Sequence, residues 1–340
     1  VRGWTVHREF YYNDSGRQME LLARSVWARY QQALGEDVPF PGDGYHGEYV
    51  QELAAGLVVE HGDRFRGDDS DEALDLMRHH AVRLLRADQD RDLNDFGGPF
   101  DEHFLESSLY ESGRIDEVVE RLRETGLVYE HEGALWLRTT EYGDQKDRVM
   151  IRSNGQPTYF LPDVAYHLGK WERGYHRAIN VQGSDHHGTM ARVQAGVQAL
   201  GLPADYPQYV LHQMVRFERG GQEVKLSKRA GSYTTLRELY EEVGVDVARY
   251  FFLMRKPEAQ LVFDLDMALD QSEKNPVYKI QYAHARMCSI FAKAGVTDAE
   301  IAGSDIALDR LELDAELELI KELTEMPSVI ESATRLRAPH

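Results

Sequence analysis

A short cationic segment near residue 225 offers the clearest chemistry in the sequence. Residues 223–231 are Glu-Val-Lys-Leu-Ser-Lys-Arg-Ala-Gly, which places Lys225, Lys228 and Arg229 within five residues and Ser227 between them. Ammonium and guanidinium groups gathered in this way can neutralise the oxygen charge that develops as a phosphoanhydride bond breaks. The alternative is a solvated surface loop, and the segment alone fits both interpretations.

A second candidate site lies where a predicted strand turns into a helix. Residues 181–188 are Val-Gln-Gly-Ser-Asp-His-His-Gly. Gly183 lets a ligand approach the backbone, the following helix N-terminus favours anionic groups, and ligands of open parallel sheets bind at the carboxyl ends of strands. Asp185 or His186 can hold a ribose hydroxyl or an amino-acid substrate there. Asp-His-His also offers metal ligands, but adjacent residues point to different faces, which disfavours a single ion. A plain helix-capping turn is the third interpretation.

A third segment, Thr-Tyr-Phe-Leu-Pro-Asp at residues 158–163, ends where we expect a helix to begin. Asp163 is a suitable N-cap residue for that helix. The carboxylate of Asp163 and the phenol of Tyr159, four residues apart, can also recognise a guanidinium group. A carboxylate binds that group through two parallel charge-assisted hydrogen bonds, and an aromatic ring covers its face.

These residues need a framework, and the first 260 residues predict alternating strands and helices. A strand at 4–12, a turn at Asn13–Gly16 and a helix at 18–34 begin the pattern. Asp-rich and Gly-rich sequence at 88–98 breaks the pattern, and short elements up to residue 152 predict an insertion with a weak core of its own. Its expected elements are a helix at 115–125 and strands at 127–130 and 134–138.

The alternation returns after Thr158 and gives way to helices near residue 260. The expected elements are a helix at 164–173, a buried strand at 177–182, a helix ending at residue 200 and a strand at 208–215. Helical periodicity follows at 265–273, 277–294 and 308–336, with Asn275-Pro276 as punctuation between the first two. We therefore expect an α/β body followed by an all-α segment.

Composition narrows the class of protein. The 340 residues exceed the usual size of one domain, and the net charge of −19 opposes non-specific nucleic-acid binding without excluding a local basic groove. The single cysteine, Cys288, excludes an internal disulfide and fits a reducing cytosol. With no apolar run near about 18 residues and no signal peptide, we expect a cytoplasmic protein without a membrane contact.

Several segments in order resemble one enzyme family. Lys225–Arg229 resembles the KMSKS signature of class I aminoacyl-tRNA synthetases, with Leu for Met and Arg for the last Ser. Other segments resemble arginyl-tRNA synthetases in particular. They are Arg8–Gln18, the insertion from Phe100 to Trp136, Gly143–Val149, Thr158–Tyr166 and Gly183–Gly188. Asn275–Arg286 resembles the start of that family's helical anticodon-binding domain. The resemblance covers essentially the whole chain.

The resemblance implies a fold and its division along the chain. It implies an α/β, Rossmann-like class I synthetase catalytic domain with a mixed insertion, followed by an incomplete all-α anticodon-binding domain of the DALR type. The implied parts are 1–90 and 156–262 for the catalytic domain, 91–155 for the insertion and 263–340 for the helical domain.

The resemblance also implies an activity. ATP, accompanied by Mg²⁺, would activate L-arginine to arginyl-adenylate, and the arginyl group would pass to the 3′ end of tRNA(Arg) in protein biosynthesis. No structural metal is implied, and the expected state is a monomer. Lys225, Ser227, Lys228 and Arg229 would act on the pyrophosphate side. Arginine would contact Tyr159, Asp163 and Asp185, and ATP would contact Gly183, His186, Met214, Val215, Lys225, Leu226 and Lys228.

The sequence departs from the family in one respect, and the alternatives are another class I synthetase, a non-catalytic tRNA-binding fragment and a nucleotidyltransferase outside the synthetases. The family's HIGH motif occurs nowhere in these residues, and we expect it upstream of Arg8; the 340 residues alone should then be inactive. A cysteinyl enzyme would need metal-binding cysteines, which Cys288 alone cannot supply, whereas a lysine- or glutamate-specific relative is less easily excluded. A non-catalytic tRNA-binding fragment is the alternative from another class. The helical tail disfavours a nucleotidyltransferase outside the synthetases.

Overall fold

The computed structural model describes residues 3–224, 235–303 and 307–340. The described chain divides into two compact units. One comprises His7–Met214, and the other comprises the chain from Val215 onward together with the first residues up to Val6. Each unit is described by itself below. No helix in the described part of the chain is both long and apolar enough to cross a membrane.

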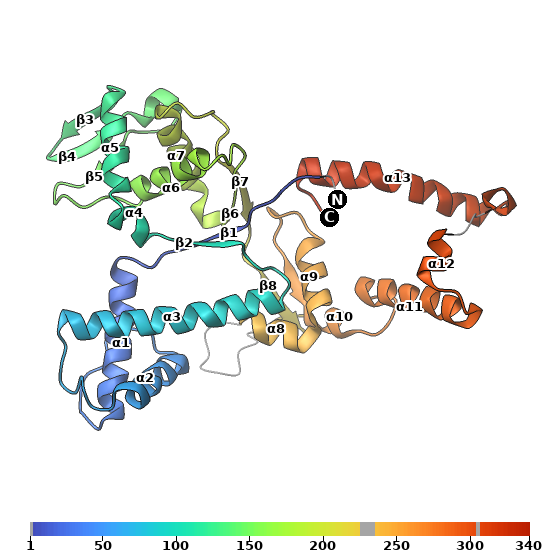
Figure 1. The fold of residues 1–340 in the computed structure, drawn as a ribbon, viewed down its shortest axis with the longest axis horizontal. Coiled ribbons are helices and arrows are strands. Elements are labelled where there is room, and N and C mark those ends of the chain that lie inside the picture. The colour runs from blue at the N-terminus through green and yellow to red at the C-terminus, as the bar shows by residue number, and fades with distance from the viewer. Residues whose placement is uncertain (1–2, 225–234, 304–306) are drawn as a thin grey trace. The chain divides into compact units, whose positions relative to one another are not determined.

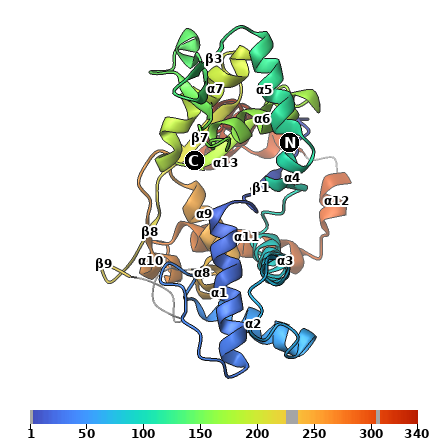
Figure 2. The ribbon, with the colours of Figure 1, turned by 90° about the vertical axis from the view of Figure 1, so that its left-hand side faces the viewer.

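The first unit begins with a parallel strand pair whose members lie far apart in sequence. Strand β1 (Glu9–Tyr12) pairs with β2 (Glu102–Leu105), with Glu9 opposite Glu102 and Tyr12 opposite Leu105. The predicted strand at 4–12 is therefore confirmed only from Glu9. Three helices connect the two strands, namely α1 (Arg17–Ala33), α2 (Glu48–His61) and α3 (Asp71–Asp95), and they form a bundle in both Figure 1 and Figure 2.

The helical bundle has its own apolar core, and its helix α3 extends farther along the chain than the sequence suggested. Leu22, Val26, Tyr30, Leu57 and Met77 are among its buried side chains. The prediction of a break at 88–98 was wrong, because α3 continues to Asp95. The Asp-rich end of α3 stays helical through contacts that periodicity does not report. An ion pair joins Arg91 to Asp88, and Asp90 accepts a hydrogen bond from Tyr12 Oη at 3.2 Å.

The segment expected to be an insertion shares its core with the following helix. It contains α4 (Ser107–Glu111), α5 (Arg114–Glu124), the antiparallel strands β3 (Val128–His131), β4 (Ala134–Leu137) and β5 (Arg148–Ile151), and a 3-10 turn, η1 (Thr139–Tyr142). Leu122, Leu137 and Met150 are fully buried in one cluster with Leu161 and Val164 of the next helix. The expected weak, separate core is therefore wrong, because these residues bury their apolar side chains against α6.

The last part of this unit is a strand–helix–strand crossover that carries two candidate segments. Helix α6 (Phe160–Glu172) precedes β6 (Ile179–Gly183), the 3-10 turn η2 (Ser184–His186), α7 (His187–Ala199) and β7 (Gln208–His212). Strands β6 and β7 are parallel, with Gly183 opposite His212. The expectation of a buried strand was wrong, because no residue of β6 is buried. Ile179 and Val181 lie on one side of the strand and are 43% and 67% exposed.

The second unit joins a small sheet to helices. Strand β8 (Arg216–Arg219) pairs with β9 (Gln222–Glu223) and, in parallel, with β10 (Val262–Asp264). Helices α8 (Leu236–Val243), α9 (Val245–Leu253) and α10 (Leu265–Leu269) accompany the sheet, and Phe217, Phe251 and Phe263 pack together. The expected helix at 265–273 ends at Leu269, and Asn275 then caps α11 (Pro276–Ala294) by accepting from Val277 N at 3.0 Å.

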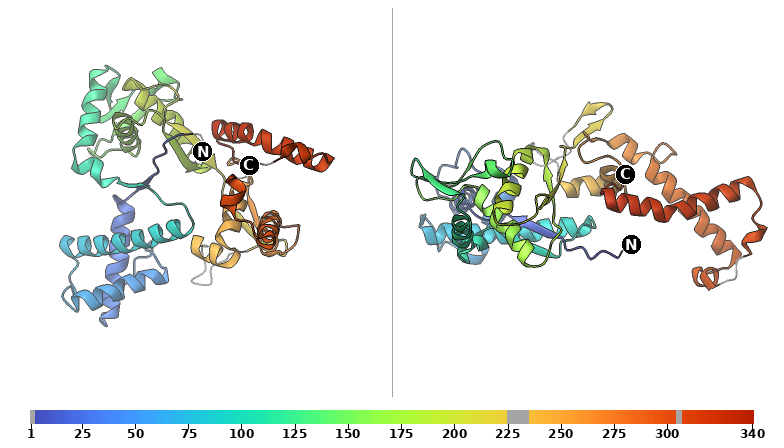
Figure 3. Two further views of the ribbon diagram at one scale, coloured as in Figure 1. Left: turned by 45° about the vertical axis from the view of Figure 1, so that its right-hand side comes forward. Right: turned by 90° about the horizontal axis from the view of Figure 1, so that it is seen from above.

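Helices α12 (Asp298–Gly303) and α13 (Asp314–Leu336) and a 3-10 turn, η3 (Leu308–Arg310), complete the chain. The helix expected at 308–336 therefore begins six residues later. Figure 3 shows α11, α12 and α13 in succession along the C-terminal part. Leu317, Leu319 and Leu323 of α13 are each at least half exposed.

Candidate active site

The start of α6 places Tyr159 and Asp163 on one side of the helix. Tyr159 is the N-cap residue, and Asp163 lies within the first turn. The prediction that Asp163 caps the helix was wrong, because the helix begins three residues before it. Residues four apart lie one above the other on a helix, so the phenol and the carboxylate share a face. Tyr159 is 74% exposed and Asp163 is partly buried.

The carboxyl group of Asp163 is in an environment that disfavours its charge. Burial raises its pKa from 3.8 to about 7; the positive charge of Arg192 opposes the rise, Glu106 adds to it, and Lys170 opposes it. A carboxylate that is desolvated while empty gains most when a cation with hydrogen-bond donors arrives. The first turn of a helix also favours negative charge, through its exposed backbone N–H groups.

A buried glutamate fixed from distant parts of the chain faces Asp163. Glu106 is 7% exposed, and its two carboxylate oxygens accept hydrogen bonds from Tyr11 Oη at 2.8 Å and Ser15 Oγ at 2.9 Å. Asp14 in turn accepts from the backbone N–H and the hydroxyl of Ser107 at 2.9 and 2.7 Å. Sequence reasoning found Glu106 only within the family resemblance, since its partners lie more than 90 residues away.

Farther along α6, polar side chains are held in a largely dry environment. His167 is 2% exposed, and its Nε2 lies 2.8 Å from Nδ2 of Asn180 on β6. Lys170 Nζ lies 3.4 Å from Asn180 Oδ1 and 4.0 Å from the centre of the Tyr166 ring. Burial lowers the pKa of Lys170 to about 8, against the opposing charges of Glu9 and Asp163. None of these residues was predicted, because helical spacing alone does not distinguish them from core positions.

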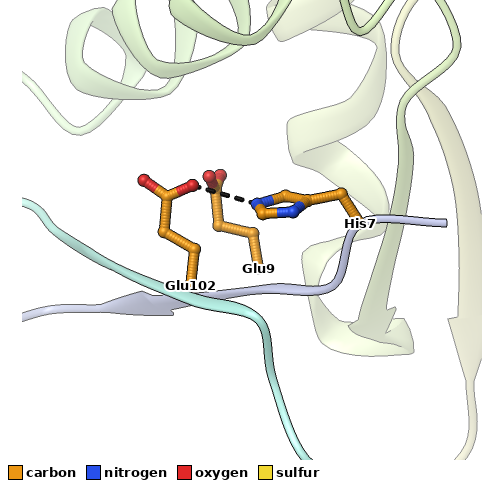
Figure 4. A group of neighbouring side chains, drawn as sticks. All are labelled: His7, Glu9 and Glu102. Carbon is orange, nitrogen blue, oxygen red and sulfur yellow. Dashed lines mark hydrogen bonds and ion pairs between the residues drawn. The ribbon is translucent and has the colours of Figure 1, made fainter.

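The group His7, Glu9 and Glu102 could in principle bind a metal ion, but a guanidinium already occupies it. One ligand atom from each lies within 4.8 Å of the others. Figure 4 shows the three side chains next to one another. Arg173 at the end of α6 donates to Glu9 Oε2 at 2.6 Å and to Glu102 Oε2 at 3.0 Å. Because this cation supplies the positive charge that a metal ion would bring, we assign the group as a structural link between β1, β2 and α6.

The Gly183–His186 turn lies at the carboxyl end of β6, as expected, and beside the end of β7. Asp185 is exposed, and its Oδ2 lies 3.7 Å from His186 Nε2. The hydroxyl of Ser184 donates a hydrogen bond to Gln213 Oε1 at 3.2 Å. Met214 follows β7 within the same unit and is 77% exposed. The structure thus brings Gly183, Asp185, His186 and Met214 to the same pair of strand ends.

The remaining predicted residues are not part of this arrangement as described. Val215 belongs to the second compact unit. Lys225, Leu226, Ser227, Lys228 and Arg229 lie outside the described residues. Their roles therefore stay predictions from the sequence.

Comparison with known families identifies the family of the chain. The family described as "tRNA synthetases class I (R), catalytic domain" matches residues 1–266, and "DALR anticodon binding domain" matches residues 280–340. The chain belongs to the arginyl-tRNA synthetase family. The predicted fold class, a class I synthetase catalytic domain followed by a helical domain of the DALR type, is confirmed.

Individual relatives agree with the family. The chain is 53% identical over 349 residues to an arginine–tRNA ligase of Bordetella avium and 52% identical over 347 residues to one of Thiobacillus denitrificans. These alignments cover 99% and 100% of the chain, which spans 62% of the length of either relative. A solved arginyl-tRNA synthetase from Campylobacter jejuni superposes with a TM-score of 0.90 at 33% identity, covering 99% of this chain and 73% of that one.

Proposed function

We propose that the protein containing this chain is an arginine–tRNA ligase that activates L-arginine with ATP and transfers it to tRNA(Arg). The family, the relatives and the Asp163 site support this proposal. In the first step an oxygen of the arginine carboxylate bonds to the α-phosphorus of ATP as the bond to pyrophosphate breaks. In the second step a ribose hydroxyl at the 3′ end of the tRNA attacks the arginyl carbonyl, and AMP leaves.

The single observation that carries the substrate assignment is the partly buried carboxyl of Asp163. It lies in the first turn of α6, on the face shared with the exposed ring of Tyr159. A guanidinium placed there would donate two hydrogen bonds to the carboxylate and lie against the ring. Its charge would also compensate the desolvation that raises the pKa of Asp163 to about 7.

The nucleotide would bind at the neighbouring strand ends. Gly183 is the last residue of β6, His186 directly precedes α7, and Met214 follows β7. We place the adenosine of ATP against these residues and Val215, with Asp185 on the arginine side. Mg²⁺ would accompany the triphosphate as part of the substrate, and the segment from Lys225 to Arg229 would neutralise pyrophosphate.

We also propose the organisation and setting that accompany this activity. The catalytic domain would comprise residues 1–90 and 156–262, the insertion residues 91–155 and the helical tRNA-binding domain residues 263–340. The protein would act in the cytoplasm as a monomer.

Arginine-dependent exchange of ATP with radiolabelled pyrophosphate tests the proposal. The full-length gene product, assayed both in the presence and in the absence of tRNA(Arg), should support exchange with arginine under at least one of these conditions, and none with lysine or glutamate under either. Binding of tRNA without exchange under any of these conditions would instead favour a non-catalytic RNA-binding protein. The 340 residues alone should give no exchange, and activity of that fragment would refute the expectation that an upstream segment is required.

A further inference from the structure

Helices α6 and α7 approach each other closely at Gly196. A Cβ atom at that position would lie 2.5 Å from Val164 Cγ2 and 3.0 Å from the ring of Phe160, so only a glycine fits without movement. Arg192 precedes Gly196 by one turn on the same face of α7, and Asp163 precedes Val164 in the first turn of α6. Arg192 and Asp163 therefore each lie within one turn of the point where the two helices meet, and the charge of Arg192 acts on the carboxyl group of Asp163.

The guanidinium of Arg192 is partly anchored and partly free of partners. Its Nη2 donates to Thr189 Oγ1, one turn earlier on α7, at 2.7 Å. Its Nε is buried and has no hydrogen-bond partner in the described part of the chain. Of the charged groups acting on Asp163, Arg192 has the largest effect, and it favours the ionised carboxylate. A fixed cation held within a dry helix contact is screened weakly by solvent.

Other groups around Asp163 come from α6 itself, from β1, α4 and β7, and from the junction of β2 and α4. Glu106, at the junction of β2 and α4, opposes its ionisation, and Lys170, on α6 itself, favours it. The phenols of Tyr11 on β1, Tyr110 on α4 and Tyr209 on β7 also face it, since the charge of Asp163 raises the pKa of each. Neutral phenols do not replace a cation, so the balance lies between Glu106 on one side and Arg192 and Lys170 on the other.

We propose that Arg192 is a positioning residue that favours the ionised form of Asp163 in the empty site, so that more of the protein is ready for the guanidinium of substrate arginine. The proposal rests on the proposed function, in which Asp163 binds that guanidinium. Arg192 acts through its charge and is not assigned a contact with the reacting atoms.

The first test measures arginine binding by calorimetry in two buffers of different ionisation enthalpy, with the full-length gene product. With the pKa of Asp163 near 7, binding at pH 7 should release about half a proton. If loss of the charge in Arg192→Gln raises that pKa by about one unit, arginine should bind about fivefold more weakly at pH 7, releasing about nine-tenths of a proton. At pH 9 the two proteins should bind alike, and Arg192→Lys should resemble the parent throughout.

Two results of this test would overturn the proposal. Unchanged affinity and proton release in Arg192→Gln would mean that its charge does not reach Asp163. A loss of affinity that is the same at pH 7 and pH 9 would mean that Arg192 contacts the substrate or only supports the fold.

A second test needs no arginine and separates this proposal from the proposed function. The pH dependence of unfolding is compared for Arg192→Gln with and without Asp163→Asn, and for the parent with and without Asp163→Asn. The difference in the free energy of unfolding between the proteins with Asp163 and with Asn at this position should stop changing near pH 7 in the parent. It should stop changing near pH 8 when Arg192 is replaced. Absence of this shift overturns the role of Arg192; presence of the shift in a protein that binds no arginine supports Arg192 and refutes the substrate assignment.

Discussion

Ionised Asp163 should destabilise the ligand-free protein, and replacing it by asparagine should therefore stabilise that protein at neutral pH. The pKa of Asp163 is raised from 3.8 to about 7, chiefly by burial. The folded state thus holds the proton more tightly than the unfolded state. For a pKa raised by folding, the stabilising contribution is fully present below the unfolded value, near pH 4, and is lost as the pH rises to about 7.

The magnitude follows from the width of that window. One pH unit within it changes the free energy of unfolding by about 1.4 kcal/mol, so the whole window of roughly three units corresponds to about 4 kcal/mol. Asparagine does not titrate. The free energy of unfolding of Asp163→Asn minus that of the parent should therefore increase by about 2.5 kcal/mol between pH 5 and pH 8 and stay constant at higher pH.

Urea denaturation at pH 5, 6, 7 and 8, followed by tryptophan fluorescence, measures this difference. Trp171 lies on α6 with Asp163 and reports on the same unit. Asp185→Asn is the matched control, because the Asp185 side chain is 81% exposed and its replacement should change stability by no more than about 0.5 kcal/mol at each pH. A difference between Asp163→Asn and the parent that does not vary with pH would refute the reasoning, since Asp163 would then ionise as an ordinary surface carboxylate.

Four further predictions, one of them for the same Asp163→Asn variant, test the site and its support. Asp163→Asn should raise the arginine KM by a factor equivalent to about 2–5 kcal/mol and leave the ATP KM nearly unchanged, as measured by steady-state exchange kinetics. Equal effects on the two KM values would argue against guanidinium binding. Glu106→Gln removes a charge that raises the pKa of Asp163, so the pH at which arginine binding is half-maximal should fall, and an unchanged pH profile would contradict the coupling. Arg173→Met leaves the buried carboxylate of Glu9 unpaired and should lower the free energy of unfolding by about 3 kcal/mol in urea denaturation, whereas a loss below about 1 kcal/mol would mean that water replaces the guanidinium. Gly196→Ala places a Cβ atom 2.5 Å from a valine methyl group of α6 and should cost about 1–3 kcal/mol in the same measurement; a neutral result would show that the two helices can separate freely.

Much of the secondary structure could be predicted from local sequence. Helix α1 and helix α11 begin and end within a residue or two of their predicted bounds, because apolar spacing and the Asn275-Pro276 cap are local signals. The end of α3 could not be predicted in this way. Its Asp-rich turns are stabilised by a contact between Asp90 and Tyr12, which lie 78 residues apart.

The candidate site was predictable only in part. Tyr159 and Asp163 were proposed because the chemistry of a phenol and a carboxylate at that spacing suits a guanidinium. The structure places Asp163 in the first turn of α6 and Tyr159 at its N-cap, and their role stays a prediction. The prediction that Asp163 caps the helix failed by four residues, which is a typical error for a helix boundary predicted from sequence. Glu106 and Arg192 could not be ranked from the sequence, since their effect on Asp163 depends on distance and burial.

The sequence by itself determined the family and the approximate bounds of several helices and strands, because motifs and periodicity are properties of neighbouring residues. Only the tertiary structure decided which charges act on Asp163. Burial, the hydrogen bonds that fix Glu106 from Tyr11 and Ser15, and the approach of α7 at Gly196 all join residues far apart in the chain. The free energy of a charge depends on its surroundings in space, and no local pattern of residues reports those surroundings.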